Sequence, residues 1–209
     1  MEMTGMKHIK VLGITGGVGA GKSTILDYLE KKYSVRVIQL DQAAHLLMEP
    51  GQPCYEKIVE RFGRKILAPD ETIDRKLLYQ ETFSDRQKVE ELNRIVHPLV
   101  KEYVREQIKI ETEADQIPFL VIEAALLLED HYEEICDTIW YVYVDPKVRI
   151  RRLEQSRGYT PEKTAQILKN QKSDEEFRLY CQFVIDNSSD FIENTYEQID
   201  KGLKEYGFL

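Results

Sequence analysis

The stretch ITGGVGAGKST, from Ile14 to Thr24, is the part of the sequence that decides the fold. It contains four glycines in eleven residues and ends in a Lys-Ser-Thr triplet. Glycine loses more conformational entropy on folding than any other residue, so this concentration needs a structural reason. The stretch fits the pattern G-x-x-x-x-G-K-[S/T], in which backbone N–H groups of a glycine-rich loop surround phosphate oxygens. Side chains would obstruct both the close approach and the positive φ angles of such a loop.

The segments on either side supply the context that a phosphate-binding loop (P-loop) requires. Residues 9–15 (IKVLGIT) form a continuous β-prone run, which is typical of a strand buried on both faces in a parallel sheet. Residues 23–33 place Ile25, Leu26 and Leu29 on one stripe of a helix. The loop is therefore expected to join a strand to a helix N-terminus, whose positive dipole end favours anions.

We predict that this loop binds the phosphates of a nucleotide. Lys22 is expected to reach the β- and γ-phosphates, and the Ser23 hydroxyl is expected to bind Mg²⁺. The expected nucleotide-binding residues are Gly17, Gly19, Ala20, Gly21, Lys22, Ser23 and Thr24.

Four more strand signals follow along the chain, at residues 35–40, 118–128, 138–144 and 183–187. Helical patterns separate them, and buried strands that alternate with helices indicate an α/β fold. We expect a single domain over residues 1–209, with a P-loop kinase-like, doubly wound, five-stranded parallel sheet. Its core covers about residues 7–42, 116–145 and 183–209.

Two helical segments interrupt the alternation. Residues 43–115 are expected to form an insertion over the active edge of the sheet. Residues 146–182 are rich in arginine and broken at Gly158, as expected for a lid that closes over a nucleotide and excludes water. The arginines of this segment have a plainer explanation as a solvated helix face.

Composition narrows the class of protein. The formal net charge of −8 argues against a nucleic-acid-binding protein, which usually carries a basic patch. The three cysteines are far apart in the sequence and do not form a C-x-x-C motif, which fits a reducing compartment. We found no signal peptide pattern and no apolar stretch long enough to cross a membrane. The sequence therefore predicts a cytoplasmic protein.

Three classes of P-loop protein compete on the residues alone: a GTPase, an ATPase motor and a small-molecule kinase. The guanine-reading motif N-K-x-D and the motif D-x-x-G are both missing from the sequence, which disfavours a GTPase. A motor usually has a strand that ends in Asp, whereas FLVIE ends in Glu123, so that alternative stays open. A kinase needs a group that orients the acceptor hydroxyl. Asp41 follows the second strand and suits this role, although it could equally cap the next helix.

The ordered set of motifs resembles the dephospho-CoA kinase family over nearly the whole chain. The similarity is carried by GITGGVGAGKST, VIQLDQAAHLLMEPGQPCYEKIVERFG, TIDRKLLYQETFSD, LNRIVHPLV, VYVDPKVRIRRLEQSRGYTPEKTAQILKNQ and FVIDN. The P-loop alone would be unspecific, whereas D-R-x-x-L…F and H-P-L in this order are far more specific.

The resemblance implies that ATP, with Mg²⁺, phosphorylates the ribose 3′-hydroxyl of dephospho-CoA, a small-molecule substrate, to give coenzyme A. Asp41 would then orient or deprotonate that hydroxyl, while Arg75 and His97 become candidate substrate-binding residues. The alternative is another P-loop kinase that acts on a nucleoside, a nucleotide or another small hydroxyl acceptor. No nucleic acid or membrane partner is expected, and the oligomeric state stays open, a monomer included.

The lid departs from the family pattern. The usual Arg-Asp before glycine is replaced by Ser156 and Arg157, so that the arginine is displaced by one residue. A shift of one residue turns a helical side chain by about 100°. The catalytic arginine beside Lys22 and Asp41 is therefore expected to be Arg152 or Arg157, and Arg152, which keeps its place, is favoured.

Overall fold

The computed structural model describes residues 8–169 and 171–209, without the side chains of Ser156, Arg157 and Ile167. The chain forms two compact units. One combines Met1–Val37 with Ile110–Leu209, and the other is Ile38–Lys109. No helix within the described part of the chain is both long enough and apolar enough to cross a membrane.

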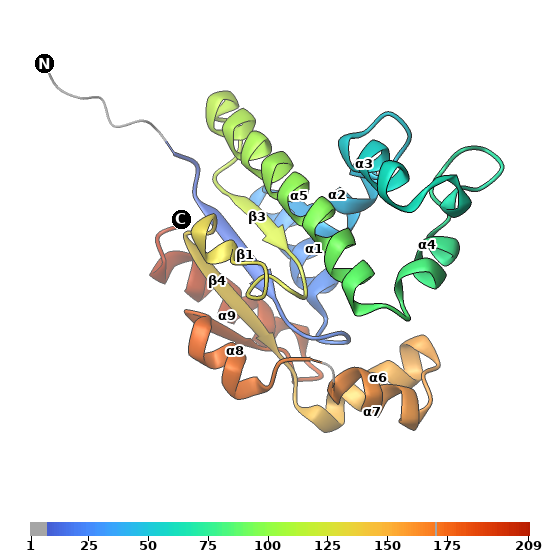
Figure 1. Cartoon of the computed structure of the whole chain (residues 1–209). Coiled ribbons are helices and arrows are strands. Elements are labelled where there is room, and N and C mark those ends of the chain that lie inside the picture. The colour runs from blue at the N-terminus through green and yellow to red at the C-terminus, as the bar shows by residue number, and fades with distance from the viewer. Residues whose placement is uncertain (1–7, 170) are drawn as a thin grey trace, which may run out of the picture. The chain divides into compact units, whose positions relative to one another are not determined.

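A five-stranded parallel sheet with the strand order β2-β3-β1-β4-β5 confirms the predicted fold class (Figure 1). The strands are β1 (Val11–Thr15), β2 (Arg36–Gln39), β3 (Leu120–Glu123), β4 (Thr138–Tyr143) and β5 (Phe183–Asp186). The strand β3 is shorter than the predicted residues 118–128. Glu123 lies opposite Ile14, one residue before β1 ends, and residues 125–131 form turns.

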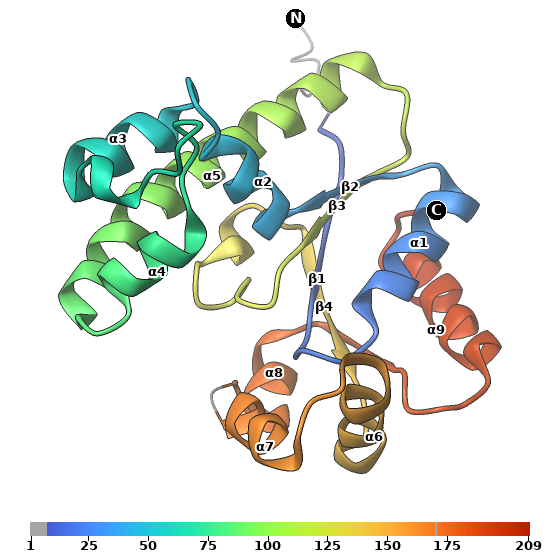
Figure 2. The same cartoon turned by 90° about the vertical axis from the view of Figure 1, so that its right-hand side faces the viewer.

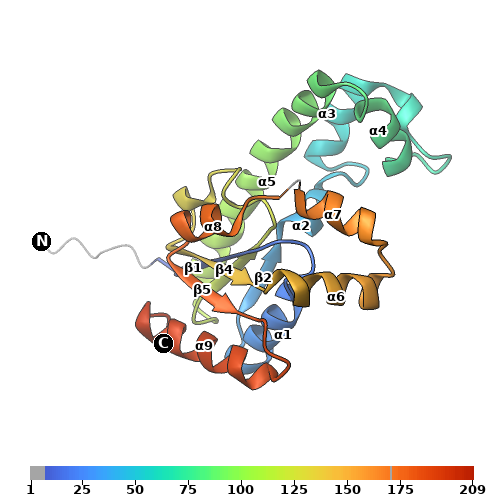
Figure 3. The same ribbon diagram turned by 90° about the horizontal axis from the view of Figure 1, so that it is seen from below.

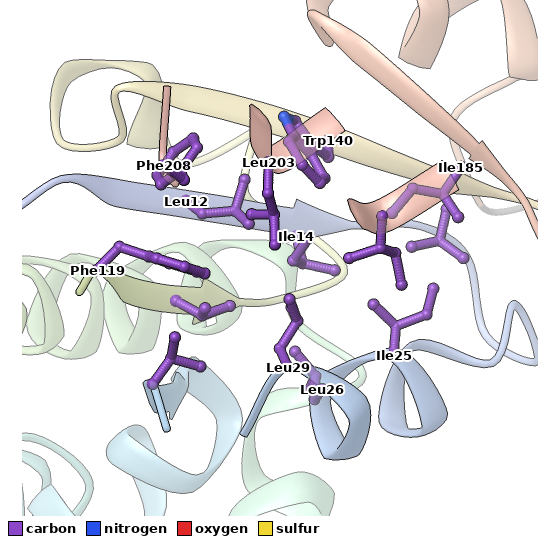
Figure 4. Packing of buried hydrophobic residues seen from close by; sticks show 14 of the residues in the cluster. Leu12, Ile14, Ile25, Leu26, Leu29, Phe119, Trp140, Ile185, Leu203 and Phe208 are labelled. Atoms are coloured by element: carbon purple, nitrogen blue, oxygen red, sulfur yellow. The ribbon is translucent and has the colours of Figure 1, made fainter. Parts of the chain in front are cut away.

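Helices α1 (Lys22–Tyr33) and α9 (Ile192–Glu205) lie side by side on one face of the sheet (Figure 2). The core under them is shown in Figure 4, where Leu12 and Ile14 of β1 meet Leu29 of α1 and Leu203 of α9. Side chains of a strand alternate between its two faces. Gly13 therefore points to the opposite face, where an added Cβ would lie 3.0 Å from both Cys136 and Ile139.

The predicted lid is a helical segment that follows β4. Helix α6 (Pro146–Arg157) continues from the end of β4, and α7 (Pro161–Lys169) folds back beside it (Figure 3). Asp145 caps α6, because its carboxylate accepts from the backbone N–H of Lys147 at 2.9 Å. Gly158 ends the helix in the left-handed conformation, with φ of 61°. The shorter helix α8 (Asp174–Tyr180) leads into β5, and a short 3-10 helix (Tyr132–Glu134) precedes β4.

The second unit is mainly helical, and it also contains the end of β2 and an isolated antiparallel bridge between Leu67 and Ile73. It contains α2 (Leu40–Leu47), α3 (Pro53–Phe62), a 3-10 turn (Arg64–Ile66), α4 (Arg75–Thr82) and most of α5 (Arg86–Ala114). Helix α5 runs without a break through Pro98. At its start, the carboxylate of Asp85 accepts from the backbone N–H of Gln87 at 2.9 Å.

Candidate active site

The loop between β1 and α1 needs glycine for two separate reasons. Gly19 and Gly21 have φ angles of 84° and 85°, which other residues rarely adopt. At Gly16 the limit is space, since an added Cβ would lie 2.7 Å from the carbonyl oxygen of Val142. The glycines therefore give the loop its backbone shape and allow it to lie against β4.

Lys22 is held inside this loop by two oxygens. Its Nζ donates to the carbonyl oxygen of Gly16 at 2.8 Å and lies 3.4 Å from Oε1 of Glu123. The Lys22 and Glu123 side chains are only 14% and 13% exposed. The ammonium group is thus kept at the first residue of the loop, where it can reach an anion bound by the loop.

Two more side chains donate hydrogen bonds to carbonyl groups of the loop. Nε of Arg149 donates to the carbonyl oxygen of Val18 at 2.7 Å, and Nδ2 of Asn187 donates to that of Ala20 at 2.8 Å. In a trans peptide the C=O and the following N–H point in opposite directions. Each bond therefore fixes the next amide, that of Gly19 or Gly21, on the opposite side of its peptide plane.

Asn187 is itself fixed by a buried hydrogen bond. It is 3% exposed, and its Oδ1 accepts from the Thr195 hydroxyl at 2.9 Å. Sequence reasoning included Asn187 in the motif FVIDN but gave it no role. Its position at the end of β5, two strands away from β1, is what brings it to the loop.

Ser23 and Thr24 lie in the first turn of α1 and are exposed. The turn contains no acidic residue, and no side chain among the described residues caps the helix. The backbone N–H groups of a helix start carry the positive end of its dipole. This end of α1 is therefore suited to an anion, as the sequence predicts.

Three arginines of α6 have different partners. Arg149 bonds to the P-loop, while Arg151 donates to Asp190 at 3.0 Å on the surface. Arg152, the predicted catalytic arginine, donates to the carbonyl oxygen of Asn187 at 2.8 Å and to that of Ser189 at 3.4 Å. The side chain of Arg157 falls outside the described part of the structure.

In the second unit, Asp41 is the second residue of α2 and is exposed. The residue at the N-cap position is Gln39, so the structure contradicts the alternative in which Asp41 caps the helix. This leaves the carboxylate available for the role of orienting a hydroxyl.

A pocket of about 190 Å³ opens in the same unit. It brings Arg75, a predicted substrate-binding residue, together with His45, which the sequence analysis did not single out. It is lined by His45, Met48, Glu49, Thr72, Ile73 and Arg75. Burial lowers the pKa of His45, and the nearby charge of Arg75 lowers it further, while Asp41 and Glu49 raise it. His97 lies on α5 and does not line this pocket.

Comparison with known proteins agrees with the motif pattern. The family model described as dephospho-CoA kinase matches residues 10–193. The chain is 35% identical to the dephospho-CoA kinase of Carboxydothermus hydrogenoformans over 93% of each chain. It is also 35% identical to that of Shouchella clausii, over 90% of this chain and 94% of the relative.

A solved structure has the same fold over almost the full length. TT1252 from Thermus thermophilus superposes with a TM-score of 0.79 at 26% identity, covering 95% of this chain and 98% of that one. Both the family match and the close relatives extend over the P-loop, the helical unit and the arginine-rich segment. The chain belongs to the dephospho-CoA kinase family.

Proposed function

We propose that this protein transfers the γ-phosphoryl group of ATP to the 3′-hydroxyl of the ribose of dephospho-CoA, giving coenzyme A and ADP. The family membership of residues 10–193 carries the proposal. The bond between the γ-phosphorus and the β–γ bridging oxygen breaks, and a bond to the 3′-oxygen forms. The hydroxyl proton leaves with a base.

The P-loop supplies the positions for the triphosphate. Backbone N–H groups of Gly19 and Gly21 are fixed by the bonds to the preceding carbonyl groups. Lys22 brings a positive charge to the β- and γ-phosphates. Phosphoryl transfer leaves the protein little covalent chemistry to supply, so positioning and charge neutralisation are the main contributions of these groups.

Asp41 is the proposed base for the 3′-hydroxyl. Its carboxylate is exposed and accepts a proton only if the substrate places its hydroxyl within hydrogen-bond distance. Arg75, at the rim of the neighbouring pocket, is proposed to bind an anionic part of the acceptor. His97 stays a candidate for substrate binding on α5.

Mg²⁺ is the proposed cofactor. Within the described part of the chain no group of three or more His, Cys, Asp or Glu side chains could hold a metal. Mg²⁺ usually keeps several waters and is bound through few protein oxygens together with substrate phosphates, which fits the exposed hydroxyl of Ser23. When bound, the ion neutralises charge on the β- and γ-phosphate oxygens. We infer a cytoplasmic location from the three free thiols.

The test is an acceptor panel with ATP and Mg²⁺. ADP release and product mass are followed with dephospho-CoA, adenosine, AMP and shikimate as acceptors. Dephospho-CoA should be the best acceptor and should gain the mass of one phosphoryl group. Coenzyme A is the matched control, because its 3′-position already carries a phosphate. Equal turnover of a nucleoside or of shikimate would contradict the proposed substrate and leave the P-loop assignment intact.

A further inference from the structure

The three described arginines on α6 differ in what surrounds their charge. Arg151 is exposed and is paired with Asp190. Arg152 is held by two carbonyl groups of the segment after β5. Arg149 is the arginine that bonds to the P-loop itself, through Nε to the Val18 carbonyl oxygen.

Arg149 is partly buried without a carboxylate to balance it. Among the described residues, no Asp or Glu oxygen lies within ion-pair distance of its guanidinium, whose second hydrogen bond is to Oε1 of the neutral side chain of Gln171. Burial lowers the pKa of Arg149, which is the effect of removing a cation from water without a counter-charge. An arginine nevertheless stays charged in proteins. Such a site favours a bound anion.

The position of this charge along the loop identifies which phosphate it would meet. Nζ of Lys22 bonds to Gly16, and this lysine reaches the β- and γ-phosphates in P-loop proteins. Gly17 is the next residue, and a Cβ added there would overlap Nη2 of Arg149. The guanidinium therefore lies at the end of the loop where the lysine ammonium lies.

The guanidinium keeps donors for such a contact. A guanidinium has five N–H groups, and the bonds to Val18 and Gln171 use two of them. The other three can donate to phosphate oxygens while the side chain still holds the loop. The pattern G-x-x-x-x-G-K-[S/T] does not require glycine at position 17. Gly17 is needed here because a larger residue would displace Arg149.

We propose that Arg149 is the lid arginine that contacts the terminal phosphate of the bound nucleotide and stabilises the charge that develops during transfer. Gln171, in the segment between α7 and α8, acts as a positioning residue for it. The assignment rests on the proposed function for the acceptor, whereas the contact with the nucleotide does not depend on which acceptor is used.

The test compares Arg149→Met and Arg149→Lys with Arg151→Met, a matched control on the same helix. Turnover is measured at saturating ATP and dephospho-CoA. Dissociation constants for Mg-ATP and Mg-ADP are measured by calorimetry without acceptor. Arginines that stabilise the transferring group contribute about 10³–10⁵ in rate where measured. Arg149→Met should therefore lower kcat at least 100-fold, Arg149→Lys less, and Arg151→Met less than twofold.

The binding data separate this proposal from the proposed function. In Arg149→Met the preference for ATP over ADP should fall at least fivefold, and Arg151→Met should keep it. This readout holds even if dephospho-CoA is not the acceptor. An unchanged ATP-to-ADP preference in both Arg149 variants would overturn the proposal. A loss in kcat of less than tenfold in Arg149→Met would also overturn the proposal, above all if Arg152→Met lost more. If Arg149→Met does not fold, Arg149→Lys and Arg149→Gln give the same two readouts.

Discussion

The ammonium of Lys22 lies 3.4 Å from the carboxylate of Glu123, with both side chains largely buried. The two residues are 101 positions apart in the sequence and meet because β1 and β3 are neighbouring parallel strands. Glu123 is the last residue of β3, and Lys22 is the first residue of the helix that follows the P-loop. A buried charge is costly unless it is paired, so each of these groups offsets the cost of burying the charge of the other at the carboxyl edge of the sheet.

Replacing Glu123 should therefore disturb the loop lysine. We expect Glu123→Gln to lower kcat about tenfold or more, because the neutral amide no longer balances the ammonium and Lys22 can leave its position. Glu123→Ala should lower kcat by at least the same factor. Asp27→Asn, an exposed change on α1, is the control and should keep wild-type kinetics. Steady-state kinetics with ATP as the varied substrate check this, and an unchanged kcat in Glu123→Gln would contradict it.

Lys22→Ala should nearly abolish turnover. The substitution removes the charge that the loop holds at Gly16, and the transition state gains charge on the γ-phosphoryl oxygens. A loss of only tenfold corresponds to ~1.4 kcal/mol, too little for a cation in contact with the transferring group. Retention of more than a tenth of wild-type kcat would therefore remove this role from Lys22. Circular dichroism of the variant shows whether the fold is kept.

Asp41→Asn should lower kcat by roughly two to four orders of magnitude, which is the usual contribution of a positioned general base. Stability should change little, because Asp41 is exposed and is not the N-cap of α2. Loss of its charge near the helix start costs about 0.3–1 kcal/mol at most. Calorimetry should show unchanged ATP affinity. A large fall in melting temperature together with an intact kcat would identify a structural role instead.

The fold and the P-loop could be predicted from the sequence because their signals are local. The run at β1, the glycines and the helical stripe of α1 lie within one short segment. The end of β3 could not be predicted, because the apolar run over residues 118–128 continues into the turns that follow Glu123. The cap of α5 is another feature that the sequence does not decide, because Ser84 and Asp85 are both good caps and the structure uses Asp85.

The contacts that shape the loop could not be predicted from the sequence. Glu123, Arg149 and Asn187 follow or end three different strands, and only the strand order brings them to the P-loop. The motif pattern favours Arg152 over Arg157 as the catalytic arginine, and this stays a prediction; the arginine that donates to the Val18 carbonyl oxygen of the loop is Arg149. The roles predicted for Asp41, Arg75 and His97 stay predictions, since they depend on where the acceptor binds.

The last prediction concerns the three cysteines, which are all free and buried. Burial raises the pKa of Cys54 to about 11 and the pKa values of Cys136 and Cys181 to about 12. The thiolate is the reactive form, so at pH 8 the folded protein holds very little of it. We expect almost no reaction with Ellman's reagent at pH 8 in the folded protein and three thiols per chain after unfolding in guanidinium chloride. Because the folded state favours the neutral thiols, reactivity should rise only as the pH increases well above 9 or as the chain opens. One fully reactive thiol in the folded protein at pH 8 would show that this cysteine is open to solvent, which would contradict its burial in the structure.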